Sequence, residues 1–245
     1  MASSAPDLTT RLLRRERLIV ASGLALLVLL CWWFVLGGAG MPQGMDAMQT
    51  PPFGALLLMW WLMMLAMMLP SAAPAVLLYA RVRQIRGGDA EIGATSVFLA
   101  GYLGTWLIFS LIAASAQALL TGPSMALDNR FFGAGVLLAA GAYQLTPLKA
   151  ACLRECRSPA EFISRHWRPR WEGAARLGVR HGLYCLGCCW MLMALLFVGG
   201  VMNLVWVVGL TIVVAAEKLA PAGQLIGRAA GIALVAWGLA KIAGL

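Results

Sequence analysis

The sequence predicts an all-α protein, a polytopic transmembrane helix bundle of about seven spans, with six as the alternative. Of the 245 residues, 61% are hydrophobic and only 12% are charged. A soluble domain carries about 25% charged residues, so a lipid bilayer is the expected solvent and partner of this chain. The charged residues are gathered in short clusters between long uncharged stretches, which is the pattern of spans and loops.

The stretches with few or no charged residues give the expected spans: 18–36, 53–80, 94–118, 131–148, 177–199, 201–218 and 225–243. Six spans result if the short segment 201–218 does not cross. Pro70 and Pro74 are expected to kink or end the second span. The uncharged run from Gly182 to Ala216 is too long for one crossing, so we expect a break at Gly199-Gly200 or near Asn203. The predicted domains are a basic tail, 1–17, and one membrane domain, 18–245, with a cytoplasmic loop at 150–176.

The basic residues predict the orientation of the chain. Fifteen of the 19 Lys and Arg side chains fall before the first span, after the second or after the fourth. Because cytoplasmic loops are rich in Lys and Arg, these three segments and the N-terminus are predicted to be cytoplasmic. The net charge of +9 does not indicate nucleic-acid binding, because the basic clusters are short and lie between apolar spans.

Five of the six cysteines fall near the cytoplasmic ends of two predicted spans: Cys152, Cys156, Cys185, Cys188 and Cys189. His181 precedes Cys185 by four residues, so one helical stripe can carry the imidazole and three of the thiols. Four sulfur and nitrogen donors suit Zn²⁺, whereas fewer sulfur ligands suit Cu(I). These six residues are the predicted metal ligands, with copper favoured over zinc. Cys31, alone in the first span, is interpreted as a packing residue.

Methionines are concentrated in and before the second span. Met59, Met63 and Met67 recur every four residues, as do Met64 and Met68, so the five form adjoining helical stripes. Core packing is the first interpretation of these stripes, and a path of soft ligands for copper is the second. Three further methionines lie in the preceding outer loop: Met41, Met45 and Met48.

Charged and polar residues near the cytoplasmic ends of the spans are candidates for support of the metal site. Glu217 and Lys218 are sequence neighbours that cannot face each other on a helix, so each needs another partner, for example a loop arginine for Glu217. Gln144 and Lys149 are further candidates for contacts around the ligands.

Four sequence segments together resemble a known family. They are Met67-Met-Leu-Pro70-Ser71-x-x-Pro74, Gln144-x-x-Pro147-Leu-Lys149-x-x-Cys152-Leu-x-x-Cys156-Arg157-x-Pro159, Gly178-x-x-x-Gly182-x-x-Cys185-x-Gly187-Cys188-Cys189-Trp190-x-Leu192-Met193, and Glu217-Lys218. About residues 59–221 are similar to the bacterial family of predicted metal-binding integral membrane proteins, a domain of unknown function. The resemblance implies metal binding at the five clustered cysteines and a place in the bacterial inner membrane.

Three functions remain open from the sequence. The first is binding or transport of a soft metal, with a metal-handling protein as a candidate partner. The second is a membrane thiol-disulfide redox protein that exchanges Cys185 with Cys188, or Cys188 with Cys189. The third is a structural protein in which a closed metal site joins two helix ends. No nucleotide loop, hydrolase triad or carboxylate pair indicates a conventional enzyme.

Overall fold

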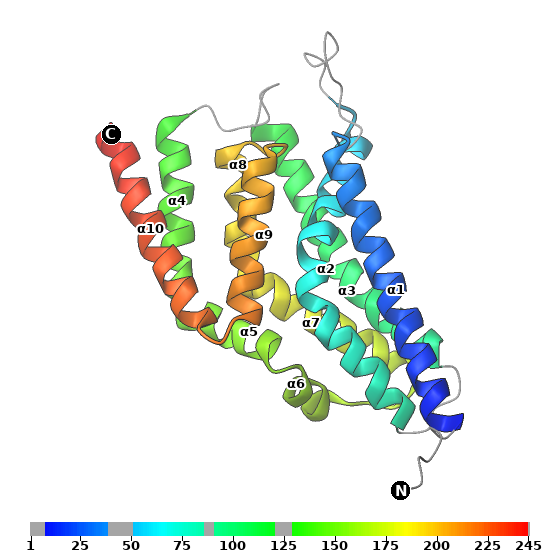
Figure 1. The fold of residues 1–245 in the computed structure, drawn as a ribbon. Coiled ribbons are helices and arrows are strands. Elements are labelled where there is room, and N and C mark those ends of the chain that lie inside the picture. The colour runs from blue at the N-terminus through cyan, green and yellow to red at the C-terminus, as the bar shows by residue number, and fades with distance from the viewer. Residues whose placement is uncertain (1–7, 39–50, 86–90, 121–128, 245) are drawn as a thin grey trace, which may run out of the picture.

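The computed structural model describes residues 8–38, 51–85, 91–120 and 129–244. Throughout these ranges every regular element is an α-helix, and none is a strand. The long helices lie side by side as one bundle (Figure 1). The predicted all-α helical bundle is therefore confirmed.

The helices in chain order are α1 (Leu8–Leu36), α2 (Phe53–Ile85), α3 (Glu91–Leu120), α4 (Arg130–Gln144), α5 (Pro147–Arg157), α6 (Pro159–His166), α7 (Arg170–Ala194), α8 (Leu196–Gly199), α9 (Leu204–Leu219) and α10 (Gly223–Ala243). The start of α1 lies at the same end of the bundle as α5 and α6, and the end of α10 lies at the opposite end (Figure 1). We refer to the first of these as the α5–α6 end.

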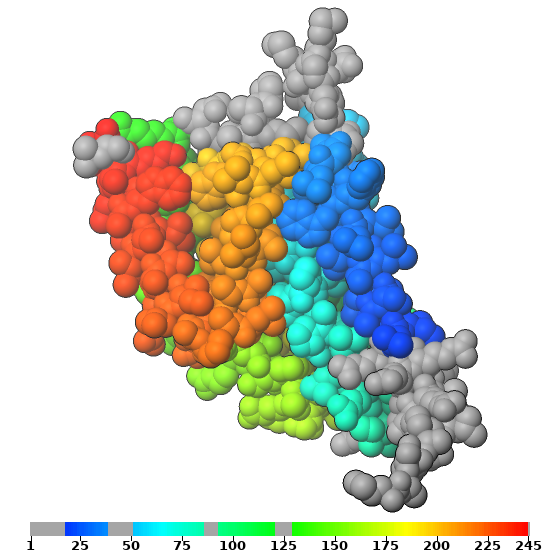
Figure 2. All heavy atoms as spheres, viewed as in Figure 1, coloured from blue at the N-terminus to red at the C-terminus, as the bar shows by residue number. Residues whose placement is uncertain are grey.

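Five helical stretches in the described residues are long and apolar enough to cross a membrane, or six if α4 and α5 together form one broken span. A total of five or six spans is closer to the predicted alternative of six than to seven. The difference arises at α9, whose 16 residues extend about 24 Å, less than the roughly 30 Å of a bilayer core. Even so, α9 lies within the bundle beside α10 (Figure 2).

The breaks between helices have local causes. Gly200 has a φ of +90°, a conformation that glycine adopts readily, and the side chain of Asn203 caps α9. The expected break at this point is confirmed. Pro70 and Pro74, in contrast, lie inside α2 and do not end it.

The fourth predicted span, 131–148, is broken where we expected continuous helix. Pro147 has no N–H to continue the helix and disfavours helical geometry at Thr146. Thr146 is extended and accepts a hydrogen bond from the backbone N–H of Lys149, so a new helix begins. The axes of α4 and α5 differ in direction by 63°. Cys152 and Cys156 consequently lie on a separate helix rather than on an extension of α4.

The segment 150–176, predicted as a loop, is largely helical. It contains most of α5, all of α6 and the first turns of α7. Phe162 and Ile163 of α6 are buried, while Arg165 forms ion pairs with Glu155 and Glu161. Short helices thus cover this end of the bundle. The predicted division of the chain into a basic tail, 1–17, and a membrane domain, 18–245, remains a prediction.

α3 and α7 pack closely because glycines remove side chains from their contact. A Cβ added to Gly182 would lie 2.6 Å from the Thr105 hydroxyl oxygen, and one added to Gly178 would overlap the Phe98 carbonyl. This close approach holds α7, with its cysteines, against α3.

We predict that Gly178→Ala destabilises the protein by about 2–3 kcal/mol, because the new methyl group meets backbone rather than a flexible side chain. Thermal unfolding of the purified protein measures the effect. Gly104→Ala is the matched control, because a Cβ at Gly104 of α3 has no atom within 4 Å. Equal melting temperatures for the two variants would contradict the described α3–α7 contact.

Candidate metal centre

One buried face of α7 carries four of the predicted ligands. His181, Cys185, Cys188 and Cys189 are at most 3% exposed. Their spacings of one, three and four residues place them on adjoining positions of that face, as the sequence predicted. The thiols of Cys188 and Cys189 donate to the Cys185 carbonyl at 3.0 and 2.9 Å, as cysteines inside a helix can do.

Cys156 joins this face from α5. Its Sγ lies 4.0 Å from the Sγ of Cys188. We call Cys156, Cys185, Cys188 and Cys189 the thiol cluster. Cys152, one turn earlier on α5, packs over Gly187, where an added Cβ would lie 2.8 Å from its Sγ. The absence of a side chain at position 187 therefore allows α5 to approach α7.

Lys218 of α9 also contacts the thiol cluster, through Cys185. Its Nζ lies 3.0 Å from the Sγ of Cys185, 3.3 Å from the Ser71 hydroxyl and 3.9 Å from the Met68 sulfur. The Tyr102 hydroxyl also lies 3.2 Å from the Cys185 sulfur. Lys218 is 7% exposed, and no described carboxylate pairs with it. A buried ammonium requires an anion or hydrogen-bond acceptors, so this arrangement favours a thiolate at Cys185.

Thioether sulfur adjoins the thiols. The Met68 sulfur lies 3.6 Å from the Sγ of Cys189. Met193, four residues after Cys189, is fully buried and extends the sulfur-bearing face of α7. The other α2 methionines of the two predicted stripes are also at most 1% exposed: Met59, Met63, Met64 and Met67. The outer-loop residues Met41, Met45 and Met48 lie outside the described residues.

His181 occupies an aromatic environment rather than a polar one. Its ring lies 6.1, 5.7 and 5.3 Å from the ring centres of Phe98, Tyr102 and Phe162. Its Nδ1 has no hydrogen-bond partner among the described residues. A buried imidazole nitrogen without a partner, one turn from Cys185, is available to a ligand.

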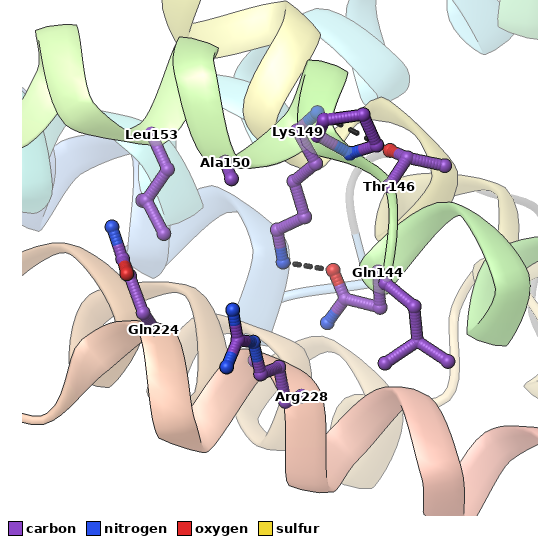
Figure 3. Close-up of a pocket in the computed structure, with 10 residues that line it drawn as sticks. Gln144, Thr146, Lys149, Ala150, Leu153, Gln224 and Arg228 are labelled. Atoms are coloured by element: carbon purple, nitrogen blue, oxygen red, sulfur yellow. Dashed lines mark hydrogen bonds between the residues drawn. The ribbon is translucent and has the colours of Figure 1, made fainter.

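Glu217 belongs to a second buried network. Its carboxylate accepts hydrogen bonds from Lys149 at 2.6 Å and Gln144 at 2.7 Å. Figure 3 shows the contact in which Lys149 also donates to Gln144. Lys149 and Glu217 have side chains only 2% exposed. Arg157 donates to the Glu217 carbonyl at 2.6 Å and to the Pro221 carbonyl at 3.0 Å, which caps the end of α9.

These contacts refine the predicted set of supporting residues. Lys218 contacts the thiol cluster directly, whereas the hydrogen bonds of Gln144 and Lys149 are made to Glu217. The loop arginine expected for Glu217 is Arg157, but it binds the backbone carbonyl and not the carboxylate. Three buried residues near the thiols were not singled out from the sequence as site residues: Ser71, Tyr102 and Met193. Ser71 and Met193 had a sequence signal, because both stand in the segments that carry the family resemblance, and Met193 also stands four residues after Cys189.

The side chains are close but are not arranged as a finished metal site. Within the described part of the chain, no three Cys, His, Asp or Glu side chains are placed to hold one ion. Cys188 and Cys189 instead point their thiols at the Cys185 carbonyl.

The donor set nevertheless fits a soft ion. Metal–thiolate distances are about 2.3 Å for zinc, so two sulfurs on one ion lie up to about 4.6 Å apart. The Cys156–Cys188 separation of 4.0 Å lies within that reach. Thioether and thiolate sulfur together select Cu(I) over harder ions.

Comparison with known families identifies the chain. A family model described as PpoB2 copper chaperone matches residues 57–241. Because the match covers most of the chain, the protein belongs to this family. The metal-related part of the predicted resemblance is thereby confirmed, while its bacterial and membrane parts remain predictions. No curated protein and no solved structure matches the chain.

We predict that Glu217→Leu destabilises the fold by about 3–5 kcal/mol, because it leaves the buried Lys149 ammonium without its anion. The double variant Lys149→Met/Glu217→Leu should recover most of this loss, because no unpaired charge remains. Thermal unfolding of the two variants and the wild type makes the comparison. If the double variant is as unstable as the single one, the ion pair is not the origin of the effect.

Proposed function

We propose that this member of the copper chaperone family is an integral membrane protein that binds Cu(I) at the thiol cluster and passes it to another metal-handling protein. Family membership supports copper handling, and five helices with the length and composition of membrane spans support the bilayer as solvent. The observation that carries the proposal is the convergence of Cys156, Cys185, Cys188 and Cys189 with Met68 in one buried place.

The residues of the site have different parts in binding. Cys156 and Cys188 come from different helices and face each other, so a bound ion would join α5 to α7. Cys185 is the thiol that Lys218 keeps as an anion before copper arrives. Cys189 and Met68 supply further sulfur on the side facing α2. His181 and Cys152 lie one turn away and are additional ligands in the proposal.

The proposed setting is the bacterial inner membrane, with the N-terminus and the α5–α6 end in the cytoplasm. Basic residues are concentrated at this end, and such residues mark cytoplasmic loops. The cytoplasm keeps thiols reduced, which suits a Cu(I) site. The buried methionines of α2 and Met193 offer a path for copper away from the thiols, with thioether sulfur at successive helical turns.

We predict that the double variant Cys185→Ser/Cys188→Ser loses at least about 90% of bound copper, because two of the four clustered sulfurs become hydroxyls that bind Cu(I) poorly. Elemental analysis of protein purified without oxygen and loaded with Cu(I) gives the stoichiometry. Cys31→Ser is the matched control, since Cys31 is a buried cysteine of α1. Unchanged copper in the double variant would refute the proposal.

Met68→Leu should weaken Cu(I) binding about tenfold while leaving the fold intact, because leucine keeps the volume and removes the thioether. Competition with a chromogenic Cu(I) chelator measures the affinity. Met59→Leu, at an equally buried position about two and a half turns away on α2, should leave the affinity of the thiol cluster unchanged. Equal affinities of the Met68 variant and wild type would remove Met68 from the ligand set.

One contact favours a second function, thiol-disulfide exchange between Cys156 and Cys188. In that reaction the two thiols would form one S–S bond, and a partner disulfide would accept the two electrons and two protons. Thiol counting after exposure to an oxidised dithiol distinguishes the functions. Loss of two thiols in the wild type but not in Cys156→Ser, without any copper binding, would favour redox chemistry.

The third function left open by the sequence, a closed structural metal site, has its own readout. A copper ion that no chelator removes would favour a closed structural site.

A further inference from the structure

A polar pocket opens at the α5–α6 end, separate from the thiol cluster. It has a volume of about 280 Å³ and lies between the α4–α5 bend and the first turns of α10. Gln144 and Lys149 line one side, and Gln224 and Arg228 line the other. The Arg228 guanidinium and the Lys149 ammonium are both directed into this space (Figure 3). α10 passes close to the ion pair at Gly227, where an added Cβ would lie 3.3 Å from the Glu217 Oε1 and 3.4 Å from the Lys149 Nζ.

The charge of the pocket is positive. Lys149 is neutralised by Glu217, the acid of the buried network. Arg228 forms neither a hydrogen bond nor an ion pair within the described residues. No acidic residue is among those that line the pocket. One guanidinium is therefore left without an anion, in a geometry that matches the oxygens of a phosphate group.

The position of the pocket suits the level of lipid headgroups. The 21 residues of α10 extend about 31 Å, which is close to the thickness of a bilayer core. Arg228 lies five residues after the start of α10, about 8 Å along its axis, so its long side chain can extend back to the interface. The first turns of α5 and α10 also border the pocket and add partial positive charge there.

We propose that this pocket binds a phosphate group through Arg228, with Gln224 as a second donor. The phosphate belongs either to an anionic lipid headgroup or to a small soluble phosphate. The proposal goes beyond copper binding, and only its lipid form rests on the proposed membrane setting. The ligand would close the space between α5 and α10 beside the Lys149–Glu217 pair.

The first test is lipid retention. Full-length protein is reconstituted in nanodiscs of phosphatidylcholine that contain phosphatidylglycerol, and native mass spectrometry counts the retained anionic lipid. Arg228→Gln should retain about tenfold less than wild type, because a charge-assisted contact is lost. Arg228→Lys keeps the charge and should retain an intermediate amount. Arg180→Gln is the matched control, because Arg180 is an exposed arginine of α7 outside the pocket.

The second test identifies the source of the phosphate. Line broadening of inorganic phosphate in ³¹P spectra, measured in detergent without phospholipid, is compared between wild type and Arg228→Gln. Broadening that requires Arg228 supports a soluble phosphate, whereas lipid retention without broadening supports a headgroup. The proposal is overturned if Arg228→Gln matches wild type with both probes. Its lipid form is overturned if Arg180→Gln loses as much lipid as Arg228→Gln. Copper stoichiometry of Arg228→Gln is measured in parallel and should equal that of wild type, so failure of the copper proposal would be seen separately.

Discussion

The charged neighbours Glu217 and Lys218 impose the strongest constraint on the interior. Both side chains are at most 7% exposed, and a buried charge is stable only when other groups compensate it. Successive residues of a helix point about 100° apart, so one partner cannot serve both. Glu217 meets Lys149 and Gln144 from the α4–α5 bend, whereas Lys218 meets Cys185 of α7 and Ser71 of α2. The end of α9 thereby links the helices that carry the thiols to those that border the phosphate pocket.

Sequence patterns predicted the features that depend on local spacing. Helical periodicity placed His181 and three cysteines on one face, and Gly200 with Asn203 marked a break, because these signals act within a few residues. The bend at Thr146 also had a local signal in Pro147, which the prediction of one continuous span over 131–148 did not use. The contact of Lys218 with Cys185 joins residues 33 positions apart. Such a pairing depends on how α7 and α9 pack, which periodicity does not contain.

Burial alone does not distinguish a packing methionine from one that binds copper. Complete burial of Met59, Met63 and Met64 agrees equally well with core packing and with a path for copper, since both require an enclosed side chain. Met68 differs because its sulfur adjoins a thiol and an ammonium at once. In a copper chaperone family, a thioether sulfur beside thiols is a candidate copper ligand, which is a role in addition to packing.

The order Glu-Lys at the end of α9 has a consequence for helical register. One residue inserted or deleted between Leu204 and Val214 would rotate the end of the helix by about 100° and shift it by about 1.5 Å. The carboxylate would then turn away from the Lys149 ammonium and the Lys218 ammonium away from the thiols, even if no ligand residue were altered. Changes in helix length are therefore expected to be less tolerable in α9 than in residues 18–36 of α1, where no residue is charged and many apolar side chains are exposed.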